Sequence, residues 1–193
     1  MENADGAMNF EVGNTIDFGK SKWGPYQWII LKVENDKTLI ITKEIVKCRP
    51  YDSSPVDAEG RIAKKFSTTW EHCTLRNYLN LHFYNNTFTP EEQSKILSVV
   101  LKNEDNPSYK TPGGNDSTDK IFILSASEAK AYFKNDASRK NTWRSKEQNW
   151  WLRTPGATGE YAATVSKAGK VGTRGGYAFM GLTGIRPALW LSL

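Results

Sequence analysis

The C-terminal stretch, residues 150–193, constrains the fold more than any other part of the chain. Residues 150–153 begin with two tryptophans and run into a Thr-Pro-Gly turn, which predicts a short strand. Residues 185–191 are mostly apolar, interrupted by one arginine and one proline. They predict a buried strand with Pro187 near its start, where a missing backbone donor does least harm.

The segment between these two strands predicts a binding surface. Residues 162–165 and 169–172 predict a β-hairpin. Residues 173–184 are rich in glycine and carry interleaved aromatic side chains. A loop of this kind, held between strands, is a common place for ligand binding. The ligand-binding residues predicted from this pattern are Tyr161, Arg174, Tyr177, Phe179 and Met180, joined by Trp143.

The N-terminal half predicts a second hairpin. Residues 28–33 and 38–43 are apolar, β-branched runs separated by four polar residues. Residues 15–18 predict a short strand ahead of them. Residues 1–9 are polar and are expected to be a disordered tail or a cloning remnant, so that residues 10–193 form one domain.

Three helices are predicted by capping-box patterns, in which a Ser or Thr is followed by a Glu three residues later. The pairs are Thr68 with Glu71, Thr89 with Glu92, and Ser125 with Glu128. Apolar spacing then indicates which side of each helix is buried. The residues expected on these sides are Leu75, Leu79 and Phe83 in the first helix, Ile96, Val99 and Val100 in the second, and Ala129, Tyr132 and Phe133 in the third.

Polar segments predict surface loops at residues 49–61, 102–120 and 135–148, and the first two of them also contain proline and glycine. Residues 121–124 predict a short buried strand between the last two loops. Strands on both sides of the helices suit an α+β domain, in which two to three helices flank a curled antiparallel sheet.

Three motifs carry a family resemblance: W-x-L-R-T-P from Trp150, A-x-x-V-x-x-x-G-x-V from Ala162, and G-I-R-P-A-L-W-L from Gly184. Together with the apolar runs of the N-terminal half, they resemble the uncharacterised bacterial DUF6273 family. The resemblance implies a C-type-lectin-like fold with paired N- and C-terminal strands and a long loop region. That fold is shared with formylglycine-generating enzymes and with the variable proteins of diversity-generating retroelements. The family brings no assigned activity.

Composition favours an ordinary soluble protein. Hydrophobic residues make up 38% of the chain and charged residues 24%. The net charge of +5 is spread along the chain, which favours a solvated surface over nucleic-acid binding. No stretch approaches the roughly 20 apolar residues of a membrane span. A monomer is expected, cytoplasmic unless an export signal has been removed, with an unknown protein or glycan as its ligand.

Metal binding is not predicted, and no cofactor is expected. The two histidines, His72 and His82, have no third ligand at zinc spacing. Acidic and amide residues crowd one loop, but their spacing does not match an EF-hand, so a solvated acidic loop is favoured. These loop residues are Asp105, Asn106, Asn115, Asp116 and Asp119.

The two cysteines, Cys48 and Cys73, give little support to an enzyme. Formylglycine-generating enzymes work through cysteines late in the chain, and none follows Cys73 here. Two free, mostly buried thiols are favoured, although one disulfide is possible. A cysteine-dependent enzyme therefore stands as an alternative to a binding module, and a purely structural domain as another.

Several arginines and tryptophans are assigned structural roles. Each of the arginines sits in apolar or aromatic surroundings, where a buried charge must be paired. An anion site is one interpretation, and bracing of loops through backbone carbonyls or a carboxylate is the favoured one. The residues assigned structural roles are Trp70, Arg76, Trp151, Arg153 and Arg186.

The function predicted from the sequence is therefore a non-catalytic ligand-binding module. In retroelement-diversified proteins of the lectin-like fold, the variable region ends just before a Gly-x-Arg strand. Residues 184–186 resemble that boundary. The side chains expected to be replaceable on this basis are Thr173, Arg174, Tyr177, Phe179 and Leu182, with a loop of fixed sequence as the alternative.

Overall fold

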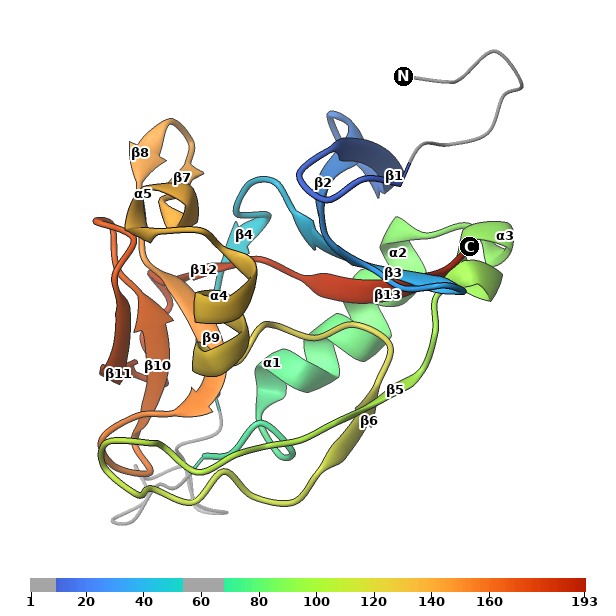
Figure 1. Ribbon diagram of the computed structural model, residues 1–193. Helices are drawn as coiled ribbons and strands as arrows, with labels where there is room; N and C mark the ends of the chain where they lie inside the picture. Colours follow the sequence, from blue (N-terminus) through green and yellow to red (C-terminus); the bar gives the residue numbers. More distant parts are fainter. Residues whose placement is uncertain (1–9, 54–67) are drawn as a thin grey trace.

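Two curled sheets with a few short helices form the structure, a computed structural model that describes residues 10–53 and 68–193 (Figure 1). The predicted α+β class is confirmed, and strands predominate. The tail predicted at residues 1–9 and part of the loop predicted at residues 49–61 lie outside the described residues.

The first sheet has four antiparallel strands in the order β1-β2-β3-β13. Its strands are β1 (Thr15–Ser21), β2 (Gly24–Val33), β3 (Lys37–Thr42) and β13 (Ala188–Ser192). Because Ile29 pairs with Ile41 and Ile30 with Ile40, the predicted N-terminal hairpin is confirmed. The C-terminal strand pairs with β3, which joins the two ends of the chain in one sheet.

The second sheet has five strands in the order β11-β10-β9-β12-β4. Its strands are β4 (Lys47–Cys48), β9 (Trp150–Pro155), β10 (Tyr161–Val165), β11 (Val171–Tyr177) and β12 (Gly184–Ile185). The predicted β10–β11 hairpin is confirmed, but β11 extends to Tyr177. The predicted loop at residues 173–184 is therefore strand in its first part, because Tyr161 and Ala162 still offer pairing partners there.

The C-terminal segment crosses from one sheet to the other (Figure 1). The single strand predicted at residues 185–191 is wrong: β12 and β13 are separate strands in different sheets, divided at Arg186 and Pro187. Pro187 cannot donate to a ladder, but its carbonyl accepts a hydrogen bond from the Thr42 amide at 2.9 Å. The crossing therefore keeps backbone bonding to the end of β3.

The longest helical segment combines α1 (Thr74–Asn77), a π-helical turn η1 (Tyr78–Phe83) and α2 (Tyr84–Thr87). The start predicted at Thr68 is wrong. The Thr68 hydroxyl donates to Asp52 at 2.9 Å instead, and the Cys73 sulfur caps the helix by accepting from the Arg76 amide at 3.4 Å. The predicted apolar face is confirmed, since Leu75, Leu79 and Phe83 are all buried.

The other two capping boxes form as predicted, at the starts of α3 (Pro90–Lys95) and α4 (Ala126–Tyr132). Contrary to the prediction, Val99 and Val100 do not lie on a helix. They belong to β5 (Val99–Leu101), which pairs with β6 (Ser117–Asp119). The short α3 ends because Ile96 already adopts extended backbone.

The predicted loops and the short strand between them differ from expectation in three places. The polar segment at residues 135–148 holds α5 (Asp136–Arg139) and a small hairpin of β7 (Thr142–Trp143) and β8 (Lys146–Glu147). The expected strand at residues 121–124 is buried, but it makes only one isolated bridge, from Phe122 to Ala188. Within the loop predicted to be solvated, Asn106 and Asp119 are buried, so that part of the prediction is wrong.

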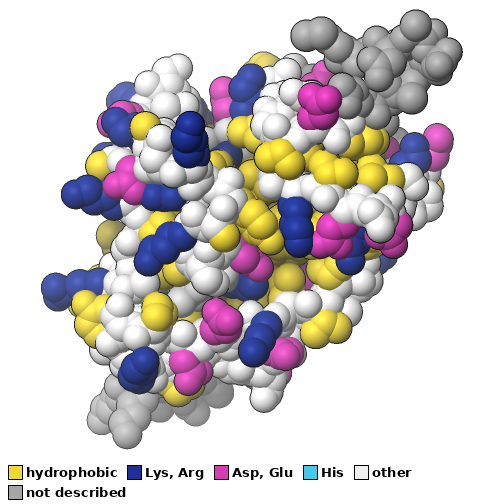
Figure 2. Space-filling model, viewed as in Figure 1, with side chains coloured by type: hydrophobic (Ala, Val, Ile, Leu, Met, Phe, Trp, Pro, Cys, Tyr) yellow, Lys and Arg dark blue, Asp and Glu magenta, His cyan; other side chains and the backbone are white. Residues whose placement is uncertain are grey.

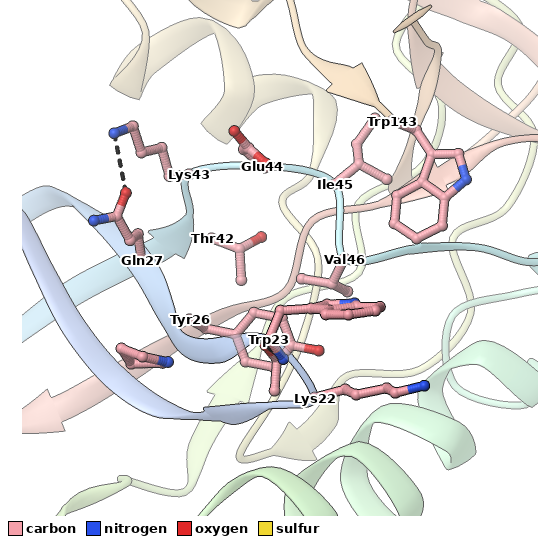
Figure 3. A pocket seen from close by; sticks show the side chains of 12 residues that line it. Lys22, Trp23, Tyr26, Gln27, Thr42, Lys43, Glu44, Ile45, Val46 and Trp143 are labelled. Carbon is pink, nitrogen blue, oxygen red and sulfur yellow. Dashed lines mark hydrogen bonds between the residues drawn. The ribbon is translucent and has the colours of Figure 1, made fainter. Parts of the chain in front are cut away.

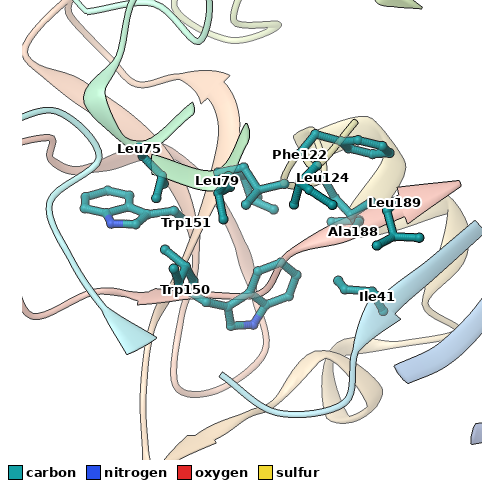
Figure 4. Packing of buried hydrophobic residues seen from close by; sticks show 14 of the residues in the cluster. Ile41, Leu75, Leu79, Phe122, Leu124, Trp150, Trp151, Ala188 and Leu189 are labelled. Atoms are coloured by element: carbon teal, nitrogen blue, oxygen red, sulfur yellow. The ribbon is translucent and has the colours of Figure 1, made fainter. Parts of the chain in front are cut away.

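One hydrophobic cluster fills the space between the sheets and the helical segment (Figure 4). Four of the seven tryptophans, Trp28, Trp70, Trp150 and Trp151, are completely buried. Their indole nitrogens still find acceptors: Trp70 donates to Asp119 at 2.9 Å and Trp151 to the Arg49 carbonyl at 2.8 Å. These rings therefore belong to the core, as predicted for Trp70 and Trp151.

The three predicted structural arginines brace the chain in different ways. Arg76 donates from Nε to the buried Asp119 at 2.6 Å. Arg153 forms a bidentate pair with Glu128 and donates to the Ile123 carbonyl. Burial acts to raise the pKa of Glu128, but Arg153 outweighs it and holds that pKa below its usual value.

Arg186 is buried without a carboxylate partner among residues 10–53 and 68–193. Its Nε and Nη2 donate to the Thr42 carbonyl at 3.1 and 2.9 Å, and Nη2 also reaches the Lys43 carbonyl. The guanidinium carbon lies 5.0 Å from the Trp150 ring centroid and 5.3 Å from that of Phe133. Burial lowers the pKa of Arg186 to about 9. Carbonyl dipoles and aromatic faces thus take the place of a counter-ion.

Replacing Arg186 should destabilise the fold. Arg186→Ala leaves the buried Thr42 carbonyl and the partly buried Lys43 carbonyl without their side-chain donors, so we expect a loss of about 2–4 kcal/mol in urea unfolding. The exposed Arg174→Ala is the matched control and should change stability by less than about 0.5 kcal/mol. Equal effects of the two substitutions would contradict the bracing role.

Candidate functional site

The predicted C-terminal binding residues form an aromatic strip, defined here as Tyr161, Tyr177 and Phe179. Tyr161 on β10 pairs directly with Tyr177 at the end of β11, and their ring centroids lie 4.2 Å apart. The rings of Tyr177 and Phe179 are 5.4 Å apart. Tyr177 and Phe179 are nearly half exposed, as is Met180, and Leu182 beyond them is 72% exposed.

The loop that follows the strip is anchored along its length. Ala178 is fully buried; its amide donates to the Glu160 carbonyl at 2.9 Å and its carbonyl accepts from Asp52 at 3.0 Å. Five residues on, the Thr183 carbonyl accepts from the Arg49 amide at 3.1 Å. The exposed side chains of this loop therefore project from a fixed backbone.

Asn106 is a structural residue that sequence reasoning placed in a solvated loop. Its side-chain amide donates to the carbonyls of Pro155, Gly156 and Thr173 at 2.7, 3.0 and 2.7 Å. Its carbonyl oxygen accepts from the Ser108 amide at 2.9 Å. Asn106 thus clamps the end of β9 to β11 just below the aromatic strip. No local pattern in the sequence signals such a non-local role.

The electrostatics of the strip are mild. A hydrogen bond with Tyr177 raises the pKa of Tyr161, and the nearby Arg174 acts in the opposite direction. Arg174 therefore lies near the strip. On the molecular face drawn in Figure 2, basic and acidic side chains are interspersed, without one dominant sign.

Trp143 is not brought to the aromatic strip. It lies on β7, near the Trp150 end of β9, whereas Tyr161 and Tyr177 lie near the Pro155 end. Trp143 instead lines a cavity of about 380 Å³ together with Trp23 and Tyr26 (Figure 3). Trp23 was not among the residues predicted to bind a ligand.

The two cysteines are free and do not form a nucleophilic site. Cys73 is buried, and burial raises the pKa of its thiol to about 12. Burial also raises the pKa of the partly exposed Cys48. His72 contacts Glu71 at 3.2 Å and His82 stacks on Tyr78. The predicted free thiols are confirmed, and raised pKa values leave both of them protonated at neutral pH.

The family model of DUF6273, described as "Domain of unknown function", matches residues 35–193. The chain belongs to the DUF6273 family. No curated protein and no solved structure matches the chain. The matched region includes the whole aromatic strip and Trp143, whereas Trp23 and Tyr26 on the first hairpin lie before it.

Within residues 10–53 and 68–193, no three His, Cys, Asp or Glu side chains gather as a metal-binding group. In the same part of the chain, no helix has both the length and the apolar character needed to cross a membrane.

Thiol labelling should distinguish the two cysteines. With a maleimide at pH 8 under native conditions, we expect slow modification of Cys48 and none of Cys73, because the Cys73 thiol is buried and protonated. Both should react at similar rates in denaturant. Rapid native labelling of Cys73, measured by mass spectrometry of tryptic peptides, would reopen the cysteine-dependent enzyme.

Removing the Asn106 clamp should be costly. Asn106→Ala deprives three backbone carbonyls of a donor, and we expect a loss of about 2–3 kcal/mol in urea unfolding. Asn103→Ala is a control in the same loop, since among the described residues the Asn103 side chain donates only to Asn115 and Ser117 within that loop. A loss for Asn106→Ala no larger than the control's would show that the clamp is dispensable.

Proposed function

We propose that this protein is a non-catalytic binding module that docks a protein partner through the aromatic strip. The observation that supports this most is the row of contacting rings, of which Tyr177 and Phe179 are exposed, continued by Met180 and Leu182 on an anchored backbone. Tyrosine, phenylalanine and methionine are enriched in the cores of protein interfaces. Rigid rings also lose little conformational entropy on binding.

A C-type-lectin-like architecture is part of this proposal. Three features support it: sheets that curl, β13 pairing beside the N-terminal hairpin, and a loop region presented between strands. The predicted placement of ligands on that loop region is consistent with the position of the aromatic strip. The coarser α+β description holds independently of this assignment.

The same surface suits sequence diversification. The five side chains predicted to be replaceable are all at least partly exposed. Gly175, between them, is different: its φ is +77°, and a Cβ there would lie 2.1 Å from the Ala162 carbonyl. Ala178 is fully buried. Variable positions therefore alternate with positions that the backbone fixes.

A combinatorial library over those five positions should fold in most of its members, because the side chains contribute little to the core. Libraries over Gly175 and Ala178 are the matched comparison and should mostly fail. Soluble expression and cooperative urea unfolding are the measurements. Widespread failure of the five-position library would make the loop structural and remove the proposed binding face. Its positions are Thr173, Arg174, Tyr177, Phe179 and Leu182.

The docking proposal is tested by cross-linking and affinity capture of partners, followed by binding measurements with each purified partner. Tyr177→Ala and Phe179→Ala should each weaken binding by about 30-fold, the effect of a hot spot worth about 2 kcal/mol. Trp23 lies in the turn between β1 and β2 of the first sheet, whereas the strip belongs to the second sheet. Trp23→Ala should therefore leave the affinity unchanged. If a protein carrying both Tyr177→Ala and Phe179→Ala bound its partners with unchanged affinity, the strip would not be the docking face.

A further inference from the structure

A second candidate site lies at the tip of the first hairpin, where β1 meets β2. Trp23 is 88% exposed there, the most exposed large hydrophobic side chain among the described residues. The turn that presents it is closed by Ser21, whose hydroxyl donates to the Gly24 carbonyl at 2.8 Å and accepts from the Trp23 amide at 3.1 Å. An indole on a fixed turn, without core contacts to justify it, is available for a ligand.

Trp23 forms one wall of the cavity of about 380 Å³ that Trp143 and Tyr26 also line (Figure 3). Its volume is within the range of small-molecule sites. On the opposite wall, the hairpin that carries Trp143 is tied to residues 43–46, which form the floor of the cavity. The Asn141 side chain accepts from the Ile45 amide and donates to the Lys43 carbonyl, both at 2.8 Å. The cavity is therefore built from two hairpins that the intervening residues 43–46 hold together.

Polar groups are distributed around these aromatic walls. On one rim, the side-chain amide oxygen of Gln27 accepts a hydrogen bond from the Lys43 ammonium at 3.1 Å, and Glu44 lies beside them. Thr42 is 1% exposed and lines the floor, and its hydroxyl has no hydrogen-bond partner among the described residues.

A second cavity of about 390 Å³ adjoins the first and shares Ser21, Lys22 and Tyr26 with it. Its charged and titratable lining is basic, with Lys20, Lys22 and His82 and no carboxylate. Beside it, the Arg49 guanidinium lies 3.9 Å from the Tyr78 ring centroid. The paired cavities thus join an aromatic slot to a basic extension.

We propose that this groove binds an acidic glycan. One pyranose ring lies in the slot with the C–H groups of its apolar face against the indole of Trp23 or Trp143, whose π faces are negative. Its hydroxyls bond to Gln27 and Glu44 on the rim. A carboxylate, sulfate or phosphate substituent on the chain reaches Lys20 and Lys22 in the basic extension.

Two other ligand classes fit this groove less well. A quaternary ammonium would be repelled by Lys22 and Lys43, and by Arg144, which lies over the Trp143 ring at 5.4 Å. Single-stranded nucleic acid also combines stacking with basic contacts. Glu44, however, accepts hydrogen bonds from sugar hydroxyls and repels phosphates, so the slot favours the sugar.

The test is an array of glycans bearing uronate, sialate, sulfate or phosphate groups, printed beside their neutral counterparts, followed by calorimetry on the strongest acidic ligand. We expect acidic glycans to bind above neutral ones. Trp23→Ala should weaken binding at least about tenfold. It should not lower stability, because the ring is exposed. Lys20→Gln with Lys22→Gln should weaken only the acidic glycan and reduce the salt dependence of its binding.

Three outcomes would overturn the proposal. They are an array without preference for acidic glycans, acidic binding that Trp23→Ala leaves intact, and tighter Trp23-dependent binding of an oligothymidylate than of any glycan. The doubly substituted Tyr177→Ala, Phe179→Ala protein is the matched control and should keep its full glycan affinity. Loss of that affinity would place the glycan on the aromatic strip instead. The proposal for the groove and the proposal for the aromatic strip can therefore be refuted independently of each other.

Discussion

The crossing of the C-terminal segment at Arg186 is the constraint on which the two-sheet arrangement depends. β12 and β13 belong to different sheets, so the residues between them must connect the two sheets through a buried segment. Arg186 makes this possible by satisfying carbonyls at the end of β3 while its flat guanidinium packs on Trp150 and Phe133. A lysine has one compact charge and cannot serve both purposes.

Sequence patterns predicted the elements that local chemistry decides. The capping boxes at Thr89 and Ser125 formed because each needs only residues within one helical turn. The same pattern at Thr68 failed, since a distant carboxylate, Asp52, competes for the hydroxyl. The division of the last strand and the burial of Asn106 escaped prediction for a similar reason: their partners are dozens of residues away in the chain.

The candidate surfaces show the same division between local and non-local information. The aromatic strip was predictable because Tyr177 and Phe179 are close in sequence and the hairpin register brings Tyr161 to them. The position of Trp143 was not, because it depends on how a short hairpin is tied to residues 43–45 through Asn141. The two proposed surfaces share no lining residue, so occupation of one would not block the other.

The Asn106 clamp has a consequence for chemical ageing. Asparagine side chains deamidate when the backbone nitrogen of the next residue attacks the side-chain carbonyl and closes a five-membered imide. The next residue here is Pro107, whose ring nitrogen carries no hydrogen and cannot form that imide. Conversion to aspartate would set a carboxylate against three backbone carbonyls. Pro107 therefore protects the Asn106 amide from deamidation through an imide, and with it the junction between β9 and β11.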